Sequence, residues 1–265
     1  SSKVTQEVKK DEQEVKKDEQ EVDHDEGRCH KRQKTDHAPH PSTSEKSGLS
    51  GKNMALGLLT QGLQIAETDF RSVYVDLETS DLKIGSDINQ IAAVYGESEF
   101  NCYVTPTKPI PPVVTNITGL SESQGVLYLH GKPLETVSMD EALRSFIDWL
   151  RPLKPCMLLA HKAVFDAKHF FHHLNQVDLY EEFTEEVYGF SDTIPIFRKM
   201  YPWRTSHRQV DLVRDILGRN YQAHNAVEDA KLLQELSEFA NVDKEVIIKH
   251  SGNCAYWKKR ILFER

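Results

Sequence analysis

The sequence predicts an α/β domain in which a five-stranded mixed sheet is flanked by helices. Apolar residues alternate with polar ones near residue 75, as they do on a strand, and recur at helical spacing after residues 139 and 226. The chain has 265 residues, of which 38% are hydrophobic, so it can bury a sizeable core. Its first 53 residues contain almost no large apolar side chains, and we therefore expect the domain to occupy residues 70–240.

The predicted sheet begins with a strand at residues 72–80, in which every second residue is apolar. Segments 88–94 and 100–104 also have strand-like composition, and they are joined around Gly96. This arrangement predicts a β-hairpin that extends the first strand.

Helices and strands alternate after residue 138. Ser138 and Glu141 form a capping box that begins a helix ending at Leu150. The remaining elements predicted for the domain are a strand at 156–160, a helix at 165–174, a short strand at 187–190, and three helices beginning at Ile194, Gln209 and Ala226. A C-terminal extension over residues 241–265 is predicted to contain two further helices, at 243–250 and 256–263. The β-β-β-α-β-α-β-α order implies a ribonuclease-H-like sheet, in which the right-handed crossover rule requires an antiparallel hairpin strand.

Two carboxylates end the first predicted strand. Asp76 and Glu78 are separated by one residue, so they project from the same face of the sheet. Paired carboxylate oxygens are ligands that a hard cation such as Mg²⁺ prefers. An isolated pair of this kind is more often a solvated strand end, so its interpretation depends on the rest of the sequence.

Three further candidate residues lie in later segments. Asp166 falls in the first turn of the helix after strand 156–160, a position that the helix dipole also favours for a simple capping role. If that strand lies beside the first one, Asp166 and Asp76 emerge at the same end of the sheet. In one continuous helix, His224 and Asp229 would point about 140° apart, so we expect His224 on the loop that leads into the helix.

These five residues predict metal-dependent cleavage of phosphodiester bonds. Four carboxylates brought together repel one another, and all of them can ionise at neutral pH only with bound cations. Two Mg²⁺ ions set about 4 Å apart would activate a water and steady the leaving oxygen, and Mn²⁺ could substitute. A histidine with an unperturbed pKa of about 6.5 can accept the proton of that water, and His224 is the candidate base.

The surroundings of these residues resemble the DnaQ-like 3′→5′ exonucleases of the histidine-containing (DEDDh) branch, from about residue 72 to residue 240. The resemblance includes Ile117-Thr118-Gly119-Leu120-Ser121, which is similar to the family's hGIt turn. It also includes the pair Asp192-Thr193 and the segment 212–218, which is similar to an L-x-x-x-x-LG helix.

The resemblance implies a role for each candidate residue. Asp76 would be shared by both metal ions. Glu78 and Asp229 would bind chiefly one ion, and Asp166 the other. His224 would act as the general base.

We expect substrate contacts from Leu77, Lys162 and Phe165, which flank these motifs. Lys162 departs from the family, which usually has Asn at that position. A lysine there could contact phosphate, weaken turnover, or be a solvated loop residue. Further candidates for contact with nucleic acid, chosen from loop position alone, are Lys168, Arg204, His207 and Arg208.

Within this family, the chain resembles the exonuclease-like C-terminal region of the promyelocytic leukaemia protein, and the resemblance lies in segments 89–94, 96–100 and 217–220. The chain is also similar to the three-prime repair exonucleases. The former region lacks most of the catalytic acids, whereas this chain has all of them. We therefore predict a 3′→5′ exonuclease acting on single-stranded nucleic acid or 3′ ends, with DNA favoured over RNA; the relatives also imply a homodimer. The alternative is a weakly active or inactive module that binds nucleic acid or serves as a scaffold.

The composition of residues 1–53 predicts a disordered charged tail. Three heptads, at residues 6–12, 13–19 and 20–26, each supply one apolar residue where a coiled coil requires two. A basic cluster at residues 28–34 follows and resembles a short nuclear import signal, although such clusters are common in solvated tails.

Charge and cysteine usage limit the partners and the compartment. The net charge is −8, and about −7 of it lies outside the tail. This negative charge argues against binding of a nucleic-acid duplex through broad electrostatic attraction. The four scattered cysteines indicate reduced thiols, and no apolar run approaches the length of a membrane span. We expect a nuclear or cytoplasmic protein that does not bind membranes.

Overall fold

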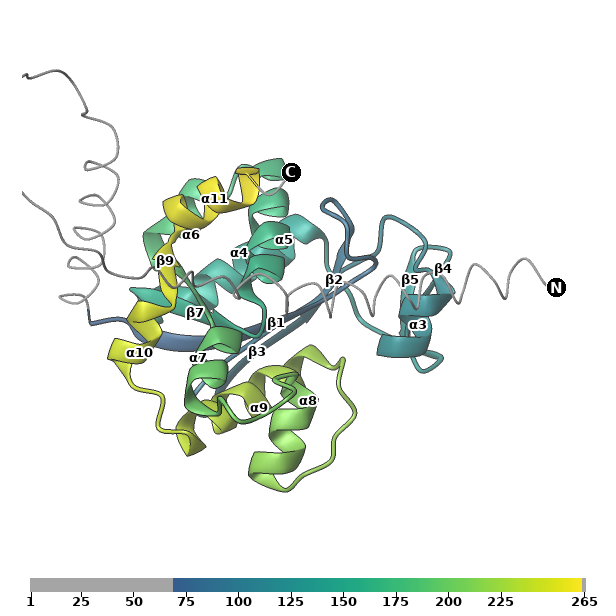
Figure 1. Ribbon diagram of the computed structural model, residues 1–265. Helices are drawn as coiled ribbons and strands as arrows, with labels where there is room; N and C mark the ends of the chain where they lie inside the picture. The colour runs from purple at the N-terminus through teal and green to yellow at the C-terminus, as the bar shows by residue number, and fades with distance from the viewer. Residues whose placement is uncertain (1–68, 264–265) are drawn as a thin grey trace, which may run out of the picture. The chain divides into compact units, whose positions relative to one another are not determined.

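The computed structural model describes residues 69–263, so the predicted tail, its heptads and its basic cluster lie outside the described residues (Figure 1). The main sheet has six strands in the order β3-β2-β1-β7-β8-β9. Its strands are β1 (Arg71–Thr79), β2 (Ile88–Tyr95), β3 (Ser98–Tyr103), β7 (Cys156–Ala160), β8 (Val187–Asp192) and β9 (Ser251–Asn253). Strands β1, β7 and β8 are parallel, which places their carboxyl ends together.

The predicted hairpin is confirmed. Strand β2 pairs antiparallel with both β1 and β3, as the crossover rule requires. The turn between β2 and β3 contains Gly96 at φ 57°, a left-handed conformation that glycine adopts without steric cost. On β1, Asp76 lies opposite Ala92 and Glu78 opposite Gln90, and an irregularity after Glu78 ends the regular pairing.

Helices cover both faces of the main sheet (Figure 1). One face packs against α4 (Met139–Leu150), α5 (Ala163–Gln176), α6 (Tyr180–Glu186) and α11 (Cys254–Phe263), and the other against α7 (Thr193–Met200), α8 (Gln209–Leu212), α9 (Ala226–Phe239) and α10 (Lys244–Lys249). The alternation on β1 divides its side chains between the two cores. Val75 and Leu77 lie in the first core, whereas Tyr74 lies in the second.

Helix α4 shows the predicted start. The Ser138 side chain accepts a hydrogen bond from the Glu141 backbone N–H, and the Glu141 carboxylate accepts one from the Ser138 backbone N–H. These contacts satisfy backbone donors that a helix end otherwise leaves unpaired. The helix ends near Leu150, followed by a short 3₁₀ turn over Arg151–Leu153.

The sheet has one strand more than the sequence predicted. The sixth strand, β9, has only three residues and pairs antiparallel with β8, between two helices that the sequence did predict. Gly189 on β8 allows this close approach, because a Cβ there would collide with the Gly252 carbonyl. Trp257 of α11 is buried beside it and donates a hydrogen bond of 2.8 Å from Nε1 to the Phe190 carbonyl.

A second, three-stranded sheet was also not predicted. It follows α3 (Pro112–Thr118) and contains β4 (Leu120–Ser123), β5 (Val126–Leu129) and β6 (Lys132–Pro133). Its small core includes Ile110, Leu120 and Leu127. The glycine of the predicted turn, Gly119, ends α3 at φ 75°.

Two other features bear on the sequence predictions. Cys102, Cys156 and Cys254 are free thiols, and the first two lie on strands. Among the helices of the described part of the chain, none has both the length and the apolar character that crossing a lipid bilayer requires.

Candidate active site

Three of the predicted carboxylates meet on one face of the main sheet. Asp76, Glu78 and Asp229 each offer an oxygen within 4.8 Å of the others. Glu78 and Asp229 are buried, and Asp76 is partly exposed. Asp229 reaches this position because α9 packs across β1 and β2, with the Ala226 N–H donating to the side chain of Gln90 at 3.4 Å.

The fourth carboxylate, Asp166, approaches from another element. It lies in the first turn of α5, is 3% exposed, and follows β7, which is parallel to β1 as predicted. Asp166 is not one of the three residues that meet within 4.8 Å. Its charge nevertheless raises the pKa of both Asp76 and Glu78, so the four acids form one electrostatic unit.

The acids are held under conditions that disfavour their ionised forms. Burial raises the pKa of Glu78 from 4.5 to about 8, and the charges of Asp229 and Asp166 add to the effect. Loss of hydration, followed by the charges of Asp229, Glu78 and Asp166, raises the pKa of Asp76 well above its ordinary value. Burial likewise raises the pKa of Asp166. Such a cluster is fully ionised at neutral pH only when cations offset the repulsion.

His224 lies on a loop, as predicted, two residues before α9 begins at Ala226. Its φ of 74° is uncommon for a residue with a side chain. The Asp229 carboxylate helps to hold this conformation, because its Oδ2 accepts hydrogen bonds from the backbone N–H of His224 (2.8 Å) and of Asn225 (3.1 Å). The His224 side chain is exposed.

The sequence did not point to two residues that contact Asp229. The Tyr221 hydroxyl donates to Asp229 Oδ1 at 2.7 Å, and Gln209 Nε2 donates to the same oxygen at 3.3 Å. Burial, followed by the charge of Asp229, raises the pKa of Tyr221 far above its ordinary value, so the phenol keeps its proton. Neither residue belongs to a motif or a periodic pattern, so no sequence signal was available.

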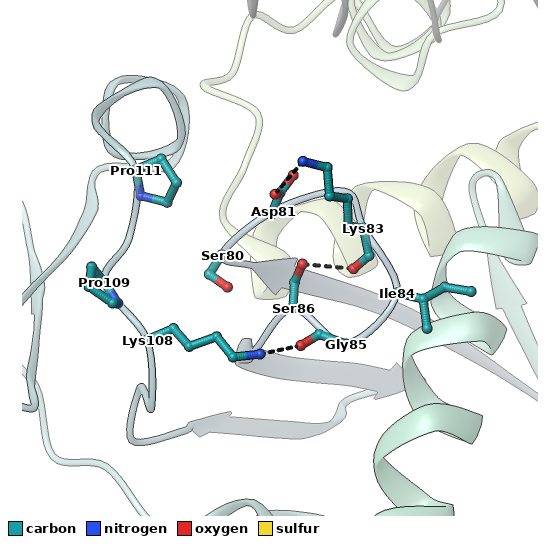
Figure 2. A pocket seen from close by; sticks show the side chains of 9 residues that line it. All are labelled: Ser80, Asp81, Lys83, Ile84, Gly85, Ser86, Lys108, Pro109 and Pro111. Atoms are coloured by element: carbon teal, nitrogen blue, oxygen red, sulfur yellow. Dashed lines mark hydrogen bonds and ion pairs between the residues drawn. The ribbon is translucent and has the colours of Figure 1, made fainter.

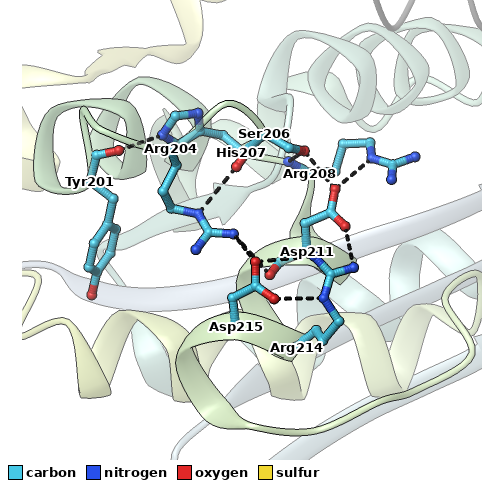
Figure 3. A network of polar contacts seen from close by, with 8 residues as sticks. All are labelled: Tyr201, Arg204, Ser206, His207, Arg208, Asp211, Arg214 and Asp215. Atoms are coloured by element: carbon cyan, nitrogen blue, oxygen red, sulfur yellow. Dashed lines mark hydrogen bonds and ion pairs between the residues drawn. The ribbon is translucent and has the colours of Figure 1, made fainter.

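A network of ion pairs joins the loop before α8 to α8 itself and to the helical turn over Val213–Leu217 (Figure 3). Arg204 contacts Asp215 at 2.5 Å, and both Arg208 and Arg214 contact Asp211, at 2.9 Å and 2.8 Å. Two of the predicted nucleic-acid contacts, Arg204 and Arg208, are thus paired with carboxylates of α8 and of the helical turn that follows it.

The same loop reaches the start of α5 through a histidine. The His207 carbonyl accepts a hydrogen bond from His161 Nε2 at 2.8 Å, and His161 Nδ1 contacts the Thr193 hydroxyl at 2.9 Å. Burial lowers the pKa of His161 to about 4, so this imidazole is neutral.

The three predicted substrate-contact residues have different settings. Leu77 is buried in the core on the sheet face opposite Asp76 and Glu78, so its side chain does not join the acidic cluster. Phe165 is half-buried, with its ring centroid 4.6 Å from that of His169. Lys162 has φ 79° at the start of α5, and its backbone N–H contacts Asp192 Oδ1 at 3.3 Å. Asn tolerates this left-handed conformation better than Lys does.

An open pocket of about 280 Å³ lies between the β1–β2 loop and the segment before α3 (Figure 2). It begins at Ser80, two residues after Glu78, and Lys83 and Lys108 contribute to its lining. The Lys108 ammonium donates to the Gly85 carbonyl at 2.6 Å, which holds the two segments together.

Comparisons with known proteins relate the sequence to exonucleases and to DNA polymerase III proteins. A family model described as Exonuclease (RNase_T) matches residues 73–236. DNA polymerase III PolC-type from Clostridium perfringens is 30% identical over 183 residues, which cover 66% of this chain and 12% of that protein. DNA polymerase III subunit epsilon from Rickettsia typhi is 28% identical, covering 64% of this chain and 73% of that protein.

The resemblance to the promyelocytic leukaemia protein is also confirmed. Human Protein PML is 25% identical over 209 residues, which cover 76% of this chain and 21% of that protein. The matched region is thus a small part of both PML and the PolC-type polymerase. All five predicted site residues fall inside the family match, which spans more than half of the sequence, and the chain belongs to the exonuclease family.

Proposed function

We propose that this chain is a metal-dependent 3′→5′ exonuclease that hydrolyses phosphodiester bonds of single-stranded nucleic acid. The observation that carries the proposal is the convergence of Asp76, Glu78 and Asp229 within 4.8 Å, with Asp166 coupled to them by charge and His224 on the adjoining loop. A structural acidic patch would gain nothing from this arrangement, because burial, followed by the charges of the neighbouring acids, raises the pKa of both Asp76 and Glu78.

The donor set fits divalent cations. Carboxylate oxygens are hard ligands for such ions. Burial, followed by the charges of neighbouring acids, raises the pKa of Asp76 and Glu78, and a bound cation would offset both effects. Asp76, Glu78 and Asp229 would hold one Mg²⁺, and Asp166 together with Asp76 the second, with Mn²⁺ expected to substitute. Such ions acidify bound water and offset charge on the phosphate.

The protein's own groups would complete the reaction. His224 accepts the proton of the attacking water as the new P–O bond forms. The bond between phosphorus and the 3′ oxygen of the preceding nucleotide breaks, which releases a 5′-mononucleotide. Asp229 keeps the loop of His224 in place through its two backbone contacts. Phe165 and Lys162, at the start of α5, are the expected contacts for a base and a phosphate.

DNA is the favoured polymer. Two of the relatives described above are DNA polymerase III proteins, which supports a DNA substrate for this chain. The net charge of −8 disfavours extended electrostatic contact with a duplex, whereas binding of a single-stranded 3′ end needs only a few local contacts.

The test is digestion of 5′-labelled single-stranded DNA and RNA of one sequence, with Mg²⁺, Mn²⁺ or EDTA. We expect a metal-dependent ladder that shortens from the 3′ end and is lost in Asp76→Asn and in His224→Ala. Asp148→Asn, which changes an exposed carboxylate on α4, is the matched control and should digest like the wild type. Activity that survives in Asp76→Asn would refute the assignment.

A second candidate function is a nucleic-acid-binding or scaffold module with little turnover. The similarity to Protein PML and the lysine at position 162 favour it. Its signature would be metal-independent binding of single-stranded DNA without laddering in either metal.

A further inference from the structure

The carboxylate of Asp229 is surrounded by four donors from the protein. Oδ2 accepts from the backbone N–H groups of His224 and Asn225, and Oδ1 accepts from Tyr221 and Gln209. Gln209 Nε2 also lies 2.8 Å from the Asp229 backbone carbonyl and 3.4 Å from the Tyr221 oxygen. The side chain of Asp229 is therefore oriented by groups from two separate segments.

We propose that Tyr221 and Gln209 are positioning residues, which turn the Asp229 carboxylate toward Asp76 and Glu78 and so set the affinity of the metal site. The inference rests on the proposed function, because it assumes that these carboxylates hold a cation. Repulsion among the three carboxylates favours rotation of Asp229 away from its neighbours. The 2.7 Å hydrogen bond from Tyr221 opposes that rotation, since it holds Oδ1 in one place.

Gln209 is suited to this task because its own position is fixed. It is the first residue of α8, directly after the loop that contains Arg204 and His207 (Figure 3). Asp211, two residues after Gln209, forms ion pairs with Arg208 and Arg214, which flank Gln209 in the sequence. The nearby His207 carbonyl accepts a hydrogen bond from His161, before α5. The segment from His207 to Gln209 thus contacts both the turn that leads into α5 and the side chain of Asp229.

The test measures Mn²⁺ binding to the full chain by the electron paramagnetic resonance signal of free Mn²⁺. Tyr221→Phe keeps the ring and removes only the hydroxyl, and we expect its Kd for Mn²⁺ to rise by roughly 10- to 100-fold. Tyr128→Phe, on the small sheet, is the matched control and should bind like the wild type. Equal Kd values for Tyr221→Phe and the wild type would overturn the proposal.

Turnover separates positioning from a direct chemical role. At saturating Mn²⁺, Tyr221→Phe should recover kcat to within a few-fold of the wild type, while the Mn²⁺ concentration for half-maximal rate rises in step with the Kd. A large loss of kcat at saturating metal, with an unchanged Kd, would mean that Tyr221 acts on the reacting atoms, and positioning would be refuted.

Gln209→Leu provides a second route if Tyr221→Phe does not fold. It removes the other donor to Oδ1, so we again expect weaker Mn²⁺ binding, and the melting temperature in EDTA reports whether the variant is folded. A folded Gln209→Leu with the wild-type Kd would remove Gln209 from the proposal. Failure of the wild type itself to bind Mn²⁺ would instead refute the proposed function.

Discussion

Replacing Glu78 by Gln should stabilise the metal-free protein at neutral pH. Burial, with the charges of Asp229 and Asp166, raises the pKa of Glu78 from 4.5 to about 8 in the folded protein. Between these two values the folded state keeps a proton that the unfolded state has released. The contribution of this group to stability is therefore fully present below pH 4.5 and is lost as the pH rises toward 8.

The size of the effect follows from the same shift. Glu78 is 6% exposed, so solvent screens it little. Linkage then gives a loss of about 1 kcal/mol at pH 5 and about 3 kcal/mol at pH 7, relative to low pH. Glutamine has no proton to exchange, so the advantage of Glu78→Gln over the wild type should grow by about 2 kcal/mol between pH 5 and pH 7.

The assay is urea unfolding in EDTA at both pH values, followed by circular dichroism. Glu97→Gln, which changes an exposed carboxylate in the β2–β3 turn, is the control and should track the wild type at both pH values. Saturating Mg²⁺ at pH 7 should stabilise the wild type more than Glu78→Gln, because the variant has lost one of the proposed metal ligands. A wild-type-to-variant difference that stays constant within about 0.5 kcal/mol from pH 5 to pH 7 would refute the reasoning.

Three other changes test the site and the fold. Asp76→Asn should slow nucleotide release by about a thousandfold, because it removes the carboxylate that we propose is shared by two metal ions. The melting temperature in EDTA should not fall; steady-state digestion measures the rate, and calorimetry measures the melting temperature. Lys162→Asn should raise the free energy of unfolding by about 1 kcal/mol, because Asn tolerates φ 79° better than Lys does. A lower free energy of unfolding in urea would show instead that contacts of the lysine side chain stabilise the fold by more than the left-handed backbone conformation destabilises it. Trp257→Ala should lower the free energy of unfolding by about 3–5 kcal/mol, since the ring is 2% exposed and bonded to Phe190; a change below about 1 kcal/mol would contradict the packing described for α11.

Local patterns were sufficient for the elements that carry the acids. The alternation on β1, the capping box of Ser138 and the apolar spacing of α9 each act over a few residues, and each predicted its element within two residues. The same alternation argued against the expected Leu77 side-chain contact. A period of two that places Asp76 and Glu78 on one face necessarily places Leu77 on the other.

Strand β9 and the two residues that contact Asp229 were missed because they depend on tertiary contacts. Strand β9 has three residues, too few for a periodic signal, and its pairing with β8 depends on Gly189, which lets the two backbones approach closely. Tyr221 and Gln209 meet Asp229 only after three segments of the chain have packed together. Sequence patterns therefore located the candidate ligands, but not the groups that orient them.

Strand β9 also decides where the chain can be shortened. Residues 251–253, which form β9, lie beyond the end of the family match at residue 236, whereas their partners on β8, residues 189–191, lie inside it. A protein cut at residue 236 would expose the N–H and C=O groups of β8 together with the hydrophobic surface that Trp257 covers. Unpaired strand edges recruit other chains, so we expect such a fragment to aggregate, whereas one that extends through α11 should remain dispersed. We therefore expect the smallest stable unit of this chain to be larger than the region that matches its family, residues 73–236.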